Sequence, residues 1–161
     1  MLELVATKAA VALVMASPRA LDALAPAGSY RCRVAPDEAM FIREPGAAEV
    51  LVRDAGSVRA GDPDAVVLDA SDGWVVWTLA GDAALEAFTR LSAIPLTRGY
   101  QQGEVANIPL RLIVEGERVH MFVPAMWREY MRRQVLDRCK TLGVAESTEA
   151  ASWTAVGGGA A

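Results

Sequence analysis

Histidine and cysteine are scarce in this sequence of 161 residues. There is one histidine, His120, and there are two cysteines, Cys32 and Cys139. A zinc site built from several histidines is therefore excluded, and so is covalent attachment of a flavin through more than one imidazole. A secreted disulfide scaffold would contain more cysteine, and we expect a cytoplasmic protein in a reducing compartment.

Long apolar runs and clustered positive charge are also missing. The longest apolar run, 9–16, is too short to cross a bilayer. The segment before it contains Glu3 and a single lysine, Lys8, which is a poor start for a signal peptide, so we expect a buried strand here. The net charge is −4 and the isoelectric point is about 5.0, which argues against a nucleic-acid-binding surface.

Motifs of hydrolytic and nucleotide-binding sites are absent. The sequence has no G-x-S-x-G, no Walker loop and no G-x-G-x-x-G, and the glycine run at 157–159 neither follows a strand nor opens a helix. The paired carboxylates, such as Asp62 and Asp64, flank turns, where short polar side chains bond to their own backbone. We expect no catalytic residue, no cofactor-binding residue and no metal ligand on this chain.

Two residues that could carry chemistry have structural explanations. His120 has no second histidine and no cysteine near it in the sequence, so a packed strand histidine is predicted. Cys32 lies between Arg31 and Arg33, which could activate a thiol. Alternation along a strand points both arginines away from Cys32, and an inert, packed cysteine is predicted.

Apolar residues are abundant, at 53% of the chain with a mean hydropathy of +0.22. Lone monomers rarely leave large apolar patches exposed. We therefore expect a partner protein to cover part of the apolar surface.

Hydrophobic periodicity and turn residues predict the order of elements. Helices are expected after Ser17-Pro18, with Ser17 as the cap, after Glu44-Pro45, after Gly81-Asp82, and over 124–142 with Gly143 ending the last one. Asp72-Gly73 predicts a hairpin between two strands. The predicted strands are 10–15, 30–34, 38–43, 65–70, 74–79, 104–114 and 119–123.

This order predicts an α+β fold made of two repeated split β-α-β-β-α units, of ferredoxin-like type, sharing a core with mixed or antiparallel sheets. The first half is expected over 1–63. The second half, over 64–145, begins with the hairpin. Residues 146–161 are expected to be a flexible tail, because they have too little apolar content to offset their ordering entropy.

The last helix is basic on its outer side and rich in aromatic residues. A solvated face is one interpretation; an interface with an acidic patch of a partner is the other, because arginine suits interfacial ion pairs. The candidate interface residues are Trp127, Arg128, Arg132, Arg133 and Trp153.

One segment resembles a known superfamily. It reads Asp72-Gly-Trp-Val-Val-Trp-Thr-Leu-Ala-Gly-Asp-Ala-Ala-Leu-Glu-Ala-Phe-Thr-Arg-Leu91 and is similar to the W-x-x-x-x-(L/V)-x-G-x-x-A opening of the glycine-cleavage T-protein superfamily. The segment Gly103-Glu-Val-Ala-Asn107, the strand pair up to Pro124 and the closing Met126-Trp-Arg-Glu-Tyr130 helix resemble the gamma subunit of heterotetrameric sarcosine oxidase. The resemblance covers Ala10 to Gly143.

The resemblance implies a subunit of an oxidoreductase complex that is not catalytic alone. Such complexes demethylate sarcosine or related N-methyl amines by oxidation and pass the one-carbon unit to tetrahydrofolate. FAD, FMN, NAD and tetrahydrofolate are then expected on larger flavoprotein partner subunits, with none on this chain. The sequence lacks the folate-gripping motifs of true T-proteins.

Two alternatives remain open from the sequence. The chain could be a stand-alone binding module for a small molecule such as a folate or an amino acid, with His120 or an arginine as its polar anchor. It could also be a small aminomethyl or acyl transferase, although it lacks an obvious nucleophile or base.

Overall fold

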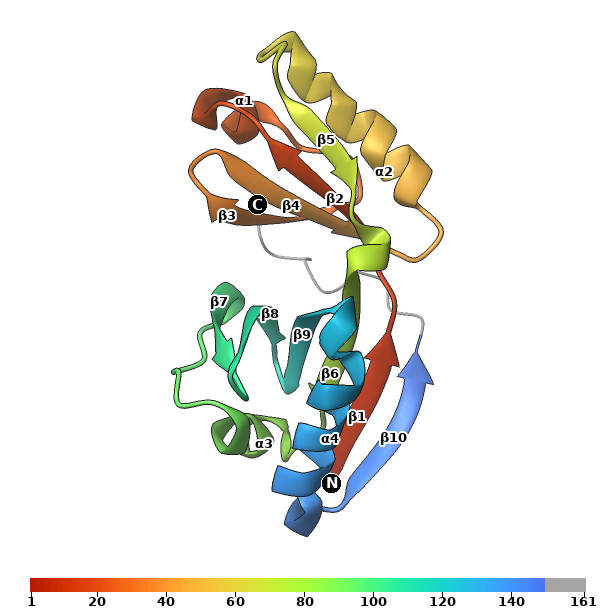
Figure 1. Ribbon diagram of the computed structural model, residues 1–161, viewed down its shortest axis with the longest axis vertical. Coiled ribbons are helices and arrows are strands. Elements are labelled where there is room, and N and C mark those ends of the chain that lie inside the picture. Colours follow the sequence, from red (N-terminus) through yellow and green to blue (C-terminus); the bar gives the residue numbers. More distant parts are fainter. Residues whose placement is uncertain (150–161) are drawn as a thin grey trace. The chain divides into compact units, whose positions relative to one another are not determined.

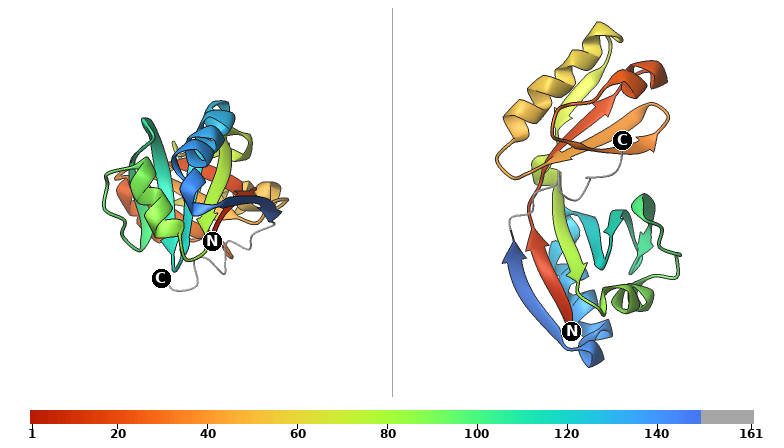
Figure 2. Two further views of the ribbon diagram at one scale, coloured as in Figure 1. Left: turned by 90° about the horizontal axis from the view of Figure 1, so that it is seen from below. Right: turned by 180° about the vertical axis from the view of Figure 1, so that it is seen from behind.

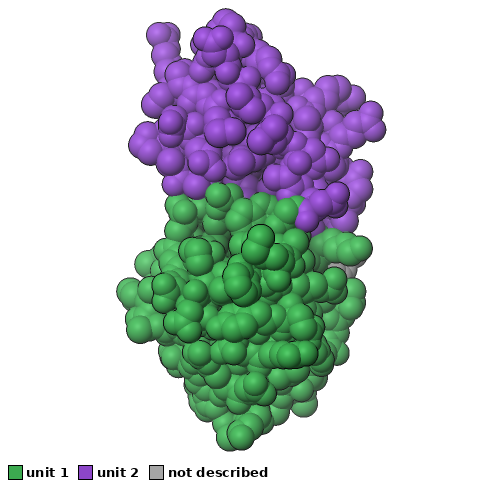
Figure 3. Space-filling view, in the orientation of Figure 1, with its two compact units in different colours: residues 1–8, 73–149 green, residues 9–72, 150–161 purple. Residues whose placement is uncertain are grey.

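A computed structural model describes residues 1–149 of the chain (Figure 1). The chain divides into two compact units (Figure 3). Unit 1 combines residues 1–8 with 73–149, and the described part of unit 2 is residues 9–72. Among the described residues each unit contains one sheet, of six strands in unit 1 and four strands in unit 2. The predicted α+β class with two repeated units is confirmed.

Unit 2 is an antiparallel sheet with two helices on one face. Its strand order is β3-β4-β2-β5, and every pairing is antiparallel. The chain order β-α-β-β-α-β with this arrangement is the ferredoxin-like fold. Its elements are β2 (Ala10–Met15), α1 (Pro18–Ala23), β3 (Tyr30–Ala35), β4 (Glu38–Arg43), α2 (Ala48–Ala55) and β5 (Val66–Asp69).

Alternation along β2 decides which side chains of unit 2 reach its helices. Ala10, Ala12 and Val14 point to the helix-covered face and join the core around Leu21 and Leu51. The residues between them point to the opposite face of the sheet, because successive side chains of a strand alternate. The apolar run expected to be a buried strand is therefore β2, which pairs with β4 on one side and β5 on the other.

Unit 1 repeats this plan and adds two strands to it. Its strand order is β10-β1-β6-β9-β8-β7. Strands β6, β8, β9 and β10 with helices α3 and α4 follow the ferredoxin-like order, while β1 lies between β6 and β10, and β7 lies outside β8 (Figures 1 and 2). Its elements are β1 (Leu2–Thr7), β6 (Trp74–Ala80), α3 (Ala84–Leu91), β7 (Gly99–Val105), β8 (Ile108–Glu115), β9 (Arg118–Pro124), α4 (Arg128–Arg138) and β10 (Val144–Glu149).

The core of unit 1 lies between its sheet and the helices α3 and α4. Leu4, Leu79 and Met121 from three neighbouring strands are fully buried with Phe88 of α3 and Met131 of α4. All described helices are short, and none is long and apolar enough to cross a membrane.

The boundaries of the units differ from the predicted halves 1–63 and 64–145. Strand β1 was not predicted; it belongs to unit 1, where it pairs with β6 and β10. Strand β5 belongs to unit 2, where it pairs with β2. Within the predicted tail 146–161, residues 146–149 are ordered because they pair with β1; the remainder lies outside the described residues.

The predicted hairpin at Asp72-Gly73 is wrong. Strands β5 and β6 belong to different sheets, and a short 3₁₀ turn, Ser71–Gly73, connects them. Asp-Gly favours a tight turn locally, but the partners that bury each strand come from distant parts of the chain.

The predicted strand 104–114 is two strands joined by a tight turn. Val105 pairs with Ile108, so only Ala106 and Asn107 form the turn between β7 and β8. Both have positive φ, 48° and 67°, as a type I′ turn requires. The prediction failed because alanine is an unusual first residue for such a turn.

Other local predictions are confirmed. Strands 10–15 and 38–43 have the predicted bounds, and Gly143, with φ of 69°, ends the C-terminal helical segment.

The predicted cap is wrong: the Ser17 side chain makes no capping hydrogen bond. Instead the Ser17 N–H donates to the Asp62 carboxylate at 2.7 Å.

The turn at Asn107 provides a test of the β7–β8 hairpin. Replacing Asn107 by valine places a β-branched residue at positive φ, and we expect the free energy of unfolding to fall by about 1–2 kcal/mol. Asn107→Gly is the matched control and should cause no such loss, because glycine adopts this conformation freely. Urea unfolding measures the stability of both variants. Equal stability of Asn107→Val and Asn107→Gly would contradict the positive φ of residue 107 in this turn.

Candidate interaction surface on helix α4

Helix α4 packs against the sheet of unit 1 through one narrow face. Met131 and Val135, four residues apart, are fully buried against the core. The arginines predicted as an interface, Arg128, Arg132 and Arg133, all lie on this helix. Their surroundings decide whether they are available to a partner.

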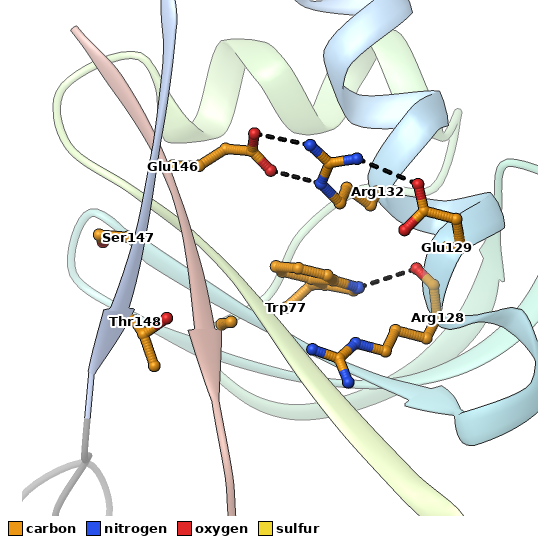
Figure 4. Close-up of a pocket in the computed structure, with 8 residues that line it drawn as sticks. Trp77, Arg128, Glu129, Arg132, Glu146, Ser147 and Thr148 are labelled. Carbon is orange, nitrogen blue, oxygen red and sulfur yellow. Dashed lines mark hydrogen bonds and ion pairs between the residues drawn. The ribbon is translucent and has the colours of Figure 1, made fainter.

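Trp77 anchors the start of α4. It lies on β6, is buried, and its indole N–H donates to the backbone carbonyl of Arg128 at 3.0 Å (Figure 4). The Arg128 guanidinium carbon lies 6.0 Å from the centre of the indole ring, at the outer limit of a cation–π contact. Arg128 therefore has an internal contact and is only partly available to a partner.

Arg132 links α4 to the edge strand β10. Its Nε and Nη2 donate to the two carboxylate oxygens of Glu146 at 2.5 and 2.8 Å, and Nη1 donates to Glu129 at 3.0 Å (Figure 4). The bond to Arg132 lowers the pKa of Glu146, and the two carboxylates, Glu146 first, raise the pKa of Arg132. This two-pronged geometry is the strongest form of an arginine–carboxylate pair.

A shallow hollow of about 420 Å³ lies between α4, β6 and β10. The Arg132 guanidinium lines this hollow and already binds the carboxylates of Glu146 and Glu129. It is therefore poorly placed to bind an anionic ligand as well. The lining residues are Ala6, Trp77, Arg128, Glu129, Arg132, Glu146, Ser147 and Thr148.

An apolar step at the beginning of α4 remains exposed. Met126 is 82% exposed and Trp127 is 41% exposed. The Trp127 ring meets the Tyr130 ring edge-on, with centroids 5.8 Å apart, and the Tyr130 hydroxyl donates to the Ala106 carbonyl at 2.7 Å. The step therefore rests on a fixed base. We call Met126, Trp127 and Arg133, which is exposed further along α4 and pairs with Glu129, the α4 step.

The α4 step differs from the predicted interface, and neither Arg128 nor Arg132 belongs to it. Trp127 and Arg133 are exposed, although Arg133 also pairs with Glu129, whereas Arg132 is held by Glu129 and Glu146. Met126 was not predicted, although it directly precedes Trp127 in the sequence. Trp153 lies outside the described residues.

The residues considered for catalysis are packed. His120 is 1% exposed, and its Nδ1 lies 2.8 Å from the Thr78 hydroxyl. Cys32 is buried, whereas Arg33 on the other face of β3 pairs with Asp22. Burial also raises the pKa of the Cys139 thiol. Within residues 1–149, no group of three or more His, Cys, Asp or Glu side chains could hold a metal ion.

Comparison with solved structures gives a clear likeness. Heterotetrameric sarcosine oxidase from Corynebacterium sp. U-96 contains a chain that superimposes with a TM-score of 0.73 at 21% identity, covering 91% of this chain and 86% of that one. The glycine cleavage system aminomethyltransferase T from Bartonella henselae matches with a TM-score of 0.69 at 13% identity. This chain shares its fold with the matched sarcosine oxidase chain and with about half of the aminomethyltransferase.

The extent of the matches differs. The match to the aminomethyltransferase covers 96% of this chain and 49% of that one, so this chain spans about half its length. The regulatory subunit of aspartate kinase from Thermus thermophilus matches with a TM-score of 0.50 at 14% identity, over 86% of this chain and 94% of that one. No family model and no curated protein matches the sequence.

The Arg132–Glu146 pair predicts a pH-dependent stability. Because the folded pKa of Glu146 lies below its ordinary value of 4.5, the pair stabilises the fold fully above that pH and loses its effect as the pH falls through the lower folded pKa. Glu146→Gln should therefore be less stable than the unchanged chain at pH 7, and the difference should shrink below about pH 4. Urea unfolding across this range measures the effect.

The matched control is Glu117→Gln, which alters an exposed carboxylate in the turn between β8 and β9. It should change stability little at either pH. A Glu146→Gln deficit that persists unchanged at pH 3 would contradict a role for the ionised carboxylate.

Proposed function

We propose that this chain is a non-catalytic, assembly subunit of a sarcosine oxidase-like complex, which oxidatively demethylates N-methyl amines with tetrahydrofolate as one-carbon acceptor. One observation carries the proposal. The match to a chain of the heterotetrameric enzyme extends over nearly the full length of both chains, so the two are of similar size. FAD, FMN, NAD and tetrahydrofolate are proposed to reside on the larger partner subunits.

The side chains of the described part of the chain support this proposal. His120, Cys32 and Cys139, which could have carried chemistry, are buried in the units. The Trp77 indole of β6 holds the start of α4, and the Arg132 side chain links α4 to β10. At the start of this helix Met126 and Trp127 remain exposed, and apolar surface suits protein contact better than chemistry.

The α4 step is the proposed contact with a partner subunit. Tryptophan and methionine, which form the exposed apolar part of the step, are enriched in the centres of interfaces. Trp127 rests against Tyr130, so little side-chain freedom is lost when a partner covers it. The partner surface should offer an apolar pocket for Met126 and Trp127.

The hollow beside α4 does not support the alternative that the chain is a small-molecule binding module. Its Arg132 is already paired with Glu146 and Glu129, and Trp77 is buried beneath it. A thermal-shift screen with folates and N-methyl amino acids tests this alternative, because a ligand that prefers the native state must raise its stability.

Co-purification tests the subunit proposal. A tagged copy of the chain, expressed together with the genes beside its own, should emerge as a yellow, flavin-containing assembly with N-methyl amine oxidase activity. A colourless chain that emerges alone would overturn the proposal.

The same experiment tests the α4 step. Trp127→Ser should weaken assembly by about tenfold or more, because truncation of a buried interface tryptophan commonly costs 2 kcal/mol or more. Leu85→Ser is the matched control, since Leu85 is 46% exposed on α3 of the same unit. Retention of full assembly by Trp127→Ser would place the interface elsewhere.

A further inference from the structure

We infer that the outer edge of β5 in unit 2 is a docking site for an extended segment of a partner protein, with alternating apolar side chains and a basic residue at each end. The inference goes beyond the proposed function and does not depend on it. It rests on three features of this edge: unpaired backbone, exposed apolar side chains and bracketing negative charge.

Within residues 1–149, no strand pairs with the outer side of β5. Strand β5 is the last strand of its sheet, and among the described strands only β2 pairs with it. The Ala70 N–H donates to the Val11 carbonyl at 2.9 Å. Because antiparallel bonding alternates, Leu68 and Val66 also bond toward β2, while the N–H and C=O of Val67 and Asp69 point outward. An added strand would bond to these groups.

The side chains of this edge are apolar and exposed. Val66 is 42% and Leu68 is 46% exposed, although both are strand residues paired in a sheet. They pair with Met15 and Leu13 of β2, so all four lie on the face opposite the helices. Met15 is also exposed. An added strand would cover this apolar strip with every second side chain.

Carboxylates bracket the strand. Asp62 and Asp64 precede it, and Asp69 and Asp72 close it. Asp62 accepts bonds from the backbone N–H groups of Ser17 and Asp64, and Asp69 accepts one from Ser71. Bonds of this kind leave the negative charge in place, and none of the four carboxylates forms an ion pair within the described residues.

The negative charge at both ends of β5 indicates which kind of strand can bind there. A second copy of the chain, pairing β5 with β5 antiparallel, would bring Asp64 of one copy near Asp69 of the other, and like charges at that distance repel. A partner strand with arginine or lysine at both ends would instead match the two acidic ends. The site therefore fits a basic-ended strand better than self-association.

The test uses the full chain and a fluorescein-labelled heptapeptide, Arg-Val-Thr-Val-Thr-Val-Arg, with blocked ends. Fluorescence anisotropy should show saturable binding that weakens as salt is added. The matched peptide with glutamate in place of both arginines should bind at least about tenfold more weakly. Absence of binding by the arginine peptide at millimolar concentration, or equal binding of both peptides, would overturn the inference.

Hydrogen exchange on the unchanged chain locates the peptide. The amides of Val67 and Asp69 should exchange at least about tenfold more slowly with peptide bound, while Val66 and Leu68, already bonded to β2, should change less. Protection at another sheet edge, or protection of β5 with a doubled mass in the absence of peptide, would overturn the proposed occupant.

Two variants separate the backbone from the side-chain contribution. Val67→Pro removes an outward N–H without breaking a bond to β2, because proline is tolerated where a strand edge faces solvent. It should reduce peptide affinity about tenfold while the circular dichroism spectrum is retained. Leu68→Ser should also weaken binding, whereas Leu85→Ser, with the same 46% exposure on α3, should not. Unchanged affinity in Leu68→Ser would contradict the site even if Val67→Pro fails to fold.

Discussion

The pairing of β1 within the sheet of unit 1 is the constraint on which the rest of the fold depends. The first strand of the chain lies between β6 and β10, bonded to both, with Leu2 and Leu4 fully buried in the core. The sheet of unit 1 can therefore form completely only after unit 2 has been traversed, because β1 precedes unit 2 in the sequence and its two partners, β6 and β10, follow it. Unit 2 is in effect an insertion between the first two paired strands of unit 1, and β10, the last described strand, is held in place by the first.

In helix α4, two arginines that the composition predicted to lie in an interface, Arg128 and Arg132, make contacts within unit 1 instead. Arg132 draws Glu146 of β10 toward the helix, and the buried Trp77 holds the carbonyl of Arg128. These contacts fix the orientation of the helix, and they leave the apolar Met126 and Trp127 projecting at its start. An exposed apolar step on a rigid base is a physically better docking element than a row of arginines, because burial of apolar area drives association while exposed ion pairs contribute little.

The likeness to the sarcosine oxidase chain and to the aminomethyltransferase establishes a fold whose two units each carry a ferredoxin-like plan. Function is argued separately, because a fold is compatible with many activities. His120, Cys32 and Cys139 are packed, while β5 and the start of α4 leave apolar surface open. Both features fit the proposed assembly role.

Local sequence determined much of this protein. Strands such as 10–15 and 38–43, the glycine that ends the last helical segment and the packed state of His120 follow from periodicity, turn residues and composition. Leu2 and Leu4 also alternate, a signal that could have revealed β1. Only the tertiary structure decided which sheet each strand joins and which arginines are already paired. Strand pairing and ion pairing join residues far apart in the chain, and no local pattern encodes the identity of a distant partner.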